Sequence, residues 1–176
     1  MRCRKMNVYQ SCPTYETESF ILRQVREEDA PALLKVYSDK NAVSRMNADF
    51  CTSDFYYETL REMENCISFW LGEYALGYYV RFSIVLKKTN DPIGTVEIFG
   101  GGDGVLRMDI RSDYDKEKYT KQLVSLAIDR FIDDFSIASL KIKTQNTPDR
   151  IPFLEEMGFE PSLVYRPQLG YHEYNF

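Results

Sequence analysis

Between residues 117 and 135, apolar side chains recur at every fourth position. These residues are Tyr119, Leu123, Ala127, Phe131 and Phe135. Because an α-helix completes a turn in 3.6 residues, this spacing gathers them on one face and predicts an amphipathic helix that packs on an apolar surface. The apolar residues 105–110 precede it and predict a short strand. The chain should therefore contain a strand–loop–helix unit whose helix covers one face of a sheet.

The remainder of the chain alternates between strand and helix patterns. Helices are expected over residues 27–39, from an N-cap at Ser53 onward, and over residues 148–158. Strands are expected over residues 20–25, 78–86, 92–100 and 139–145, with two more in the tail around Pro167 and Gly170. The glycine-rich residues 100–104 could cradle a phosphate or form a hairpin turn. The turn is favoured because strands flank these residues on both sides.

Composition narrows the class of protein. At 176 residues, we expect one domain over residues 1–176, with residues 1–17 as an N-terminal extension. A net charge of −5 argues against a nucleic-acid partner, and no apolar run of membrane-spanning length or secretory signal is seen, so a cytoplasmic protein is expected. Four cysteines and one histidine form no metal-ligand spacing, so no metal site is expected.

Four segments, in order, carry a family resemblance. They are ETESFILRQVREEDAPALLKVYSD, DPIGTVEIFG, the strand–loop–helix of residues 110–135, and FLEEMGFEP. Together they resemble the GNAT superfamily of N-acetyltransferases over residues 17–165, particularly the branch that acetylates ribosomal-protein N-termini. The resemblance implies an α/β (α+β) fold with a mixed, mostly antiparallel sheet and helices on both faces. It also implies acetyl-CoA bound where the central strands splay apart.

The resemblance places the coenzyme on the loop before the long helix. Its pantetheine arm would pair with backbone up to Ile110 and Arg111, and its pyrophosphate would lie on the start of the helix, at Lys116, Glu117, Lys118, Tyr119 and Thr120. Two family glycines are replaced here by Lys116 and Lys118. Either these lysines bind phosphates as point charges, or they are the solvated first turn of a helix whose coenzyme site has decayed.

The catalytic side has one main candidate. Glu97 alternates with Val96 and Ile98 on the strand nearest the implied acceptor cleft and could act as the base that deprotonates an amine. Its other interpretation is an exposed strand glutamate. Many family members carry a tyrosine acid where this chain has Leu154. Weaker candidates are Asp109, Tyr165 and His172, the last interpreted rather as a surface residue.

The resemblance therefore implies an acyl-CoA-dependent N-acyltransferase. It would move an acetyl group from acetyl-CoA to a primary amine of a small molecule or a peptide N-terminus, as a monomer or homodimer. One alternative is a non-catalytic binding or regulatory module that has lost the coenzyme. Another is an acyl-CoA sensor without an acceptor. The loop at Lys116 and Lys118 distinguishes the first alternative from the enzyme.

Overall fold

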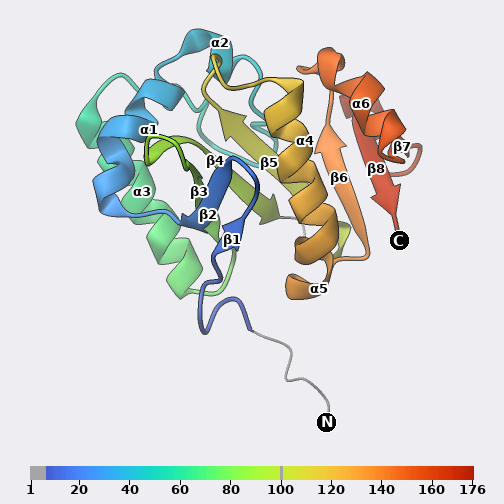
Figure 1. Ribbon diagram of the computed structural model, residues 1–176, viewed down its shortest axis with the longest axis horizontal. Helices are drawn as coiled ribbons and strands as arrows, with labels where there is room; N and C mark the ends of the chain where they lie inside the picture. The colour runs from blue at the N-terminus through green and yellow to red at the C-terminus, as the bar shows by residue number, and fades with distance from the viewer. Residues whose placement is uncertain (1–6, 100) are drawn as a thin grey trace.

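A single mixed sheet forms the centre of the computed structural model, which describes residues 7–99 and 101–176 (Figure 1). Within these residues the sheet has eight strands in the order β1-β2-β3-β4-β5-β6-β8-β7. The strands are β1 Tyr15–Glu16, β2 Phe20–Gln24, β3 Arg81–Leu86, β4 Asp91–Phe99, β5 Val105–Ile110, β6 Ser139–Lys143, β7 Glu160–Pro161 and β8 Tyr171–Asn175. The expected mixed, mostly antiparallel sheet is confirmed.

The sheet is interrupted between β5 and β6. Every other neighbouring pair of strands is antiparallel, whereas β5 and β6 run parallel and pair at one position, Val105 with Lys141. Val105 is the first residue of β5, so the two strands are not paired toward their C-terminal ends. We call this unpaired region the opening. It agrees with the splay that the resemblance implies.

Helices cover both faces of the sheet, as Figure 1 shows for α1 and α3 on one side and α4 on the other. The α-helices are α1 Ala30–Tyr37, α2 Lys40–Val43, α3 Leu60–Ala75, α4 Glu117–Leu126, α5 Ile132–Asp134 and α6 Ile151–Glu156. Shorter turns are η1 Glu27–Asp29, η2 Gly101–Asp103, η3 Ala127–Phe131, η4 Pro148–Arg150 and η5 Pro167–Leu169. One apolar cluster joins the sheet to α4, and a second joins α1 to α3.

The long amphipathic helix is confirmed over residues 117–134, although it is not uniform. Leu123, Ala127 and Phe131 are all at most 2% exposed and pack on the sheet. After α4 the helix widens into one π-helical turn, η3, before α5. Because such a turn inserts one residue, it shifts the face presented by the residues that follow.

The expected N-cap at Ser53 is wrong. Its hydroxyl instead accepts a hydrogen bond from the Phe55 amide, and Phe55 has a positive φ of 60°, so the chain remains non-helical there. The N-cap lies six residues later, at Thr59, which forms a reciprocal capping box with Glu62.

Two short elements, β1 and α2, were not expected from the sequence. The glycine-rich residues 101–103 form η2 in the β4–β5 connection, in agreement with a hairpin; Gly100 lies outside the described residues. In the tail, Pro167 begins the turn η5, and the two strands lie on either side of it.

Candidate functional site

The candidate site is built on strands β3, β4 and β5, along which apolar and polar side chains alternate. Apolar residues of these strands pack toward α4, and the residues between them are polar and buried. Strand register aligns those polar residues into two cross-strand rows: Arg81–Glu97–Arg107 and Ser83–Thr95–Asp109. A sheet face that is buried and polar is unusual, because each charge there must be paired.

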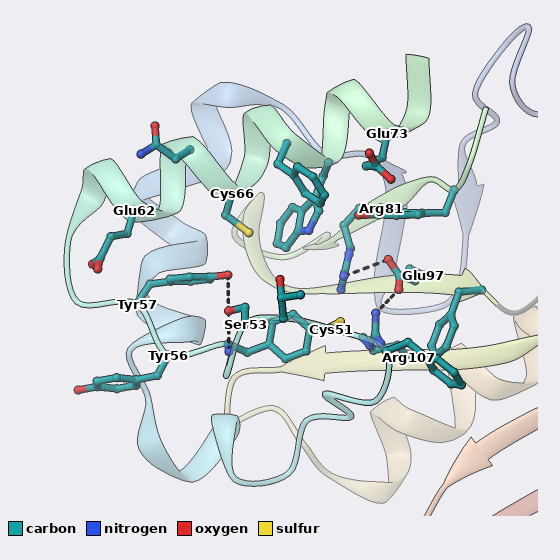
Figure 2. A pocket seen from close by; sticks show the side chains of 18 residues that line it. Cys51, Ser53, Tyr56, Tyr57, Glu62, Cys66, Glu73, Arg81, Glu97 and Arg107 are labelled. Carbon is teal, nitrogen blue, oxygen red and sulfur yellow. Dashed lines mark hydrogen bonds and ion pairs between the residues drawn. The ribbon is translucent and has the colours of Figure 1, made fainter. Parts of the chain in front are cut away.

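Glu97 lies between two arginines in the first row, as Figure 2 shows. One carboxylate oxygen accepts a hydrogen bond from Arg107. The other, Oε2, is 3.0 Å from Nη2 of Arg81 but accepts no hydrogen bond in the described part of the chain. Glu97 is 2% exposed, so the interpretation as an exposed strand glutamate is wrong.

The second row joins the sheet to α1. Asp109 accepts hydrogen bonds from Arg81, at 2.9 Å, and from the hydroxyl of Tyr37, at 2.8 Å. The same hydroxyl lies 2.7 Å from that of Thr95. Burial raises the pKa of Tyr37 well above its ordinary value, with a further contribution from Asp109. Tyr37 is therefore a neutral hydrogen-bond donor that positions α1 on the sheet.

A pocket of about 760 Å³ lies over the first row, between α3, residues 50–57 and strands β3–β5 (Figure 2). Its floor consists of Arg81, Glu97 and Arg107. Its walls are largely aromatic and include Phe50, Phe55, Tyr56, Tyr57, Phe69, Trp70, Tyr79 and Phe99. The volume falls within the range of small-molecule sites, about 300–1,000 Å³.

Aromatic rings cover the two floor arginines. The guanidinium of Arg81 lies 4.5 Å from the ring centre of Trp70, and that of Arg107 lies 4.3 Å from that of Phe99. Two cysteines also line the pocket, and burial raises the pKa of Cys66 to about 11. That thiol is protonated at neutral pH and is not a nucleophile there.

The rim of the pocket contains left-handed backbone. Phe50 and Phe55, which line the pocket, have positive φ angles of 65° and 60°. Arg166, with a φ of 44°, stacks on Phe50 with 3.8 Å between its guanidinium and the ring centre. Bulky residues in this region are strained and cluster at functional sites, where surrounding contacts hold them.

A bridging segment, residues 45–50, connects the pocket to the far side of the opening. Arg107 on β5 donates to the carbonyl oxygens of Asn47 and Asp49. The Asp49 carboxylate in turn accepts hydrogen bonds from Lys143 on β6 and from Tyr171 on β8. The bridging segment therefore links both parts of the sheet beside the pocket.

The loop expected to bind a coenzyme lies where β5 leads into α4. Lys116 is the N-cap residue of α4 with φ −126°, and Lys118 lies in the first helical turn, so neither needs the left-handed backbone that glycine permits. Both lysines are exposed. The amide groups of Glu117 and Lys118 donate no hydrogen bond within the described residues, as is normal for the first turn of a helix.

The other residues expected at this loop have local partners. Arg111 pairs with Asp113, Glu117 pairs with Lys121, and the buried Thr120 hydroxyl donates to the carbonyl of Lys116. Ile110 and Tyr119 belong to the apolar cluster under α4.

A buried ion cluster lies directly beside the loop. Asp115 accepts hydrogen bonds from Arg45, of the bridging segment, and from Arg150 in η4. Its side chain is 5% exposed, as is that of Arg150. Arg45 also pairs with the exposed Asp149. The cluster therefore joins the segment that follows β5 to the one that follows β6.

The remaining candidates are dispersed. Leu154 lies in the apolar core and Tyr165 packs edge-on against Tyr171. His172 is 7% exposed, so its interpretation as a surface residue is wrong. Its Nδ1 lies 3.0 Å from the hydroxyl of Thr144, and burial lowers its pKa, because β8 is an inner strand covered by β7.

Sequence reasoning missed both floor arginines and the aromatic walls. The sequence did contain a signal for this polar face, because arginine, serine, threonine and aspartate alternate with apolar residues on all three strands.

No helix of the described residues has the length and apolarity needed to cross a membrane. No group of three or more potential metal-binding side chains gathers in the part of the chain that the structure describes.

Comparison with known proteins gives the family. Residues 19–160 match the model of the acetyltransferase (GNAT) domain. An uncharacterized N-acetyltransferase, p20, of Bacillus licheniformis is 29% identical over 160 residues, which cover 87% of this chain and 85% of p20.

Solved structures agree in fold. The ribosomal-protein-S5-alanine acetyltransferase of Vibrio fischeri has a TM-score of 0.68 at 13% identity, covering 93% of this chain and 96% of its own. RimJ of Mycobacterium smegmatis, solved with CoA-disulfide, has a TM-score of 0.70 at 16% identity, covering 89% and 81%. The family model spans most of the chain, and these structures share its fold. The chain therefore belongs to the GNAT family of acetyltransferases.

Proposed function

We propose that this protein transfers an acetyl group from acetyl-CoA to a primary amine. The observation that carries the proposal is the opening between β5 and β6, which begins immediately after their one paired position and ends at the N-terminus of α4. An extended ligand in the opening could pair with strand backbone, and its phosphates would meet the positive end of a helix.

The residues at the loop fit such a ligand. The amides of Glu117 and Lys118 are available as donors to phosphate oxygens. The exposed side chains of Lys116 and Lys118 add positive charge where the family uses glycine, and they do so without backbone strain. Acetyl-CoA would supply the thioester that the amine attacks.

Glu97 is the proposed catalytic group on the acceptor side. Glu97 lines the pocket floor, and its buried Oε2 pairs with Arg81 but accepts no hydrogen bond in the described chain, so it keeps acceptor capacity for an amine N–H. The paired arginines neutralise the carboxylate and fix its position. Glu97 would thus orient the amine and take its proton as the new amide bond forms, while the C–S bond of the thioester breaks and CoA leaves as the thiolate.

Calorimetry with acetyl-CoA and with CoA tests the coenzyme site. The expected result is saturable binding that weakens as salt is added, because exposed lysines bind phosphate through screened charge. A Lys116→Glu, Lys118→Glu double variant should bind at least about tenfold more weakly, the factor that 1.4 kcal/mol represents. A Lys87→Glu, Lys88→Glu double variant, on the β3–β4 turn, is the matched control and should bind as the wild type does.

The non-catalytic alternative also has an observation in its favour. The amides of Tyr114, Asp115 and Lys116 already donate to carbonyl oxygens within the loop, which leaves fewer donors for a pyrophosphate. If this alternative holds, the wild type will show no saturable heat with either coenzyme. A Lys116→Gly, Lys118→Gly variant would then recover some binding only if side-chain bulk was the obstacle.

A further inference from the structure

We propose that the aromatic pocket selects a small aromatic amine as the acceptor, rather than a peptide N-terminus. This inference deepens the proposed function, because it names the substrate class for the same site. Three observations carry it. They are the aromatic walls of the pocket, the carboxylate of Glu73 in its lining, and Oε2 of Glu97 in its floor, which accepts no hydrogen bond in the described chain.

The walls favour a flat apolar group. Trp70 is buried with its ring over Arg81 of the floor, and Phe69 of α3 and Tyr56 of residues 50–57 also line the space. Aromatic walls bind an aromatic ligand through buried area and through edge or offset ring contacts. A ring within this 760 Å³ space would lie between α3 and residues 50–57.

The charges of the lining favour a cation. Each floor arginine is already paired with a carboxylate, Arg81 with both Glu97 and Asp109 and Arg107 with Glu97. The charge of both guanidinium groups is therefore offset within the protein, and Nε of Arg81 is their one buried atom without a hydrogen bond in the described chain. Glu73, by contrast, lines the pocket from α3 and makes no ion pair or side-chain hydrogen bond in the described chain.

The polar floor has one carboxylate oxygen with acceptor capacity to spare. Oε2 of Glu97 is buried and lies 3.0 Å from Nη2 of Arg81, but it accepts no hydrogen bond in the described chain. An ammonium or amine N–H supplies a donor. The same ligand is thus held by its ring against the walls and by its nitrogen at the floor.

The pocket offers little to a peptide chain. A peptide N-terminus brings backbone amides and carbonyls that need partners, and most of the walls are aromatic carbon. Residues 50–57 also close over one side, held by the left-handed Phe50 and Phe55. A compact amine brings no backbone groups that need partners and occupies less space beneath residues 50–57.

Trp70 provides a direct measurement of occupancy, because it is the one tryptophan of the chain and lines the pocket. Its fluorescence should change saturably with 2-phenylethylamine. The anionic analogue 3-phenylpropionate and the non-aromatic pentylamine should each bind at least about tenfold more weakly, equivalent to 1.4 kcal/mol. A tetrapeptide with a free N-terminal alanine should give no saturable change.

Two variants test the charge argument. Glu73→Gln should weaken phenylethylamine about threefold, within the scale of a partly exposed ion pair. Glu64→Gln, exposed on the same helix but outside the pocket lining, should leave binding unchanged. Equal binding of the anionic analogue, or no response to phenylethylamine, would overturn the inference.

Measurement of thiol release then separates this inference from the proposed function. Saturable phenylethylamine binding without thiol release from acetyl-CoA would mean that the aromatic-amine pocket stands and acetyl transfer fails. Thiol release with the tetrapeptide, combined with no fluorescence response to phenylethylamine, would leave acetyl transfer intact and reject the aromatic acceptor.

Discussion

The buried carboxylate of Glu97 forms ion pairs with the guanidinium groups of both Arg81 and Arg107. Replacement by glutamine would leave two buried cations with one remaining carboxylate partner, Asp109. We therefore expect Glu97→Gln to lower the free energy of unfolding by about 3–5 kcal/mol, the scale for breaking a buried pair. Urea denaturation measures this change.

The control for that measurement lies on the same strand. Asp91 is exposed, and no ion pair holds it in the described chain, so Asp91→Asn should change stability by less than about 0.5 kcal/mol. Equal stability of the two variants would mean that Glu97 contributes nothing to the buried network. Any loss of activity in Glu97→Gln must be compared at a temperature where the variant is folded.

The lowered pKa of Asp29 predicts how the folding stability of the protein falls in acid. Burial alone would raise its pKa, but hydrogen bonds from Arg23, Ser83 and the Arg26 amide outweigh burial and hold the pKa below the ordinary 3.8. The unfolded chain then binds the proton more readily, so the stabilisation is complete above about pH 4 and is lost as pH falls through the folded-state pKa. Melting temperatures of wild type and Asp29→Asn should converge as pH falls from 5 to 2. A constant difference would contradict the assignment.

The sequence predicted which face of a strand a residue occupies better than it predicted the ion-pair partners of that residue. Alternation along β4 predicted that Glu97 and Val96 face opposite ways, and the buried register confirms it. The pairing of Glu97 with Arg81 and Arg107 depends on the register of three strands. Register is set by turns and by the buried face as a whole, so no local pattern around Glu97 identifies its partners.

At the scale of elements, apolar periodicity shows where a helix lies, whereas capping residues show where it begins. The four-residue period located the long helix because one buried face must face the sheet throughout. The start of α3 was misplaced at Ser53, although Thr59 and Glu62 have the spacing of a capping box and Ser53 lacks a glutamate three residues on. The π-helical turn η3 has no local signature and follows from packing.

Leu123→Ala tests the packing of α4. Leu123 is 2% exposed in the cluster between α4 and the sheet, so truncation should lower the free energy of unfolding by about 2–5 kcal/mol. Ser125→Ala, on the exposed face of the same helix, should change stability by less than about 0.5 kcal/mol. Chemical denaturation of both variants measures the difference. A loss below about 1 kcal/mol for Leu123→Ala would mean that the helix does not depend on this face.

At the scale of the whole molecule, side chains replace the backbone pairing that β5 and β6 lack. Asp49 of the bridging segment contacts Lys143 and Tyr171, both beyond the opening. Asp49→Asn should therefore speed amide hydrogen exchange in β6 and β8 more than in β3 and β4, which pair with each other over six positions. Asp54→Asn, exposed in the same region of chain, is the control. Uniform acceleration over the sheet would show that the bridging segment has no local role.

The single paired position of β5 and β6 gives β5 the properties of an edge strand inside a sheet. Edge strands carry backbone groups that accept another extended chain, and proteins normally keep such edges short, charged or covered. Here the edge is interior, because β6, β8 and β7 lie beyond it in the sheet. An occupant of the opening would thus act as the missing strand and stabilise the fold as it binds.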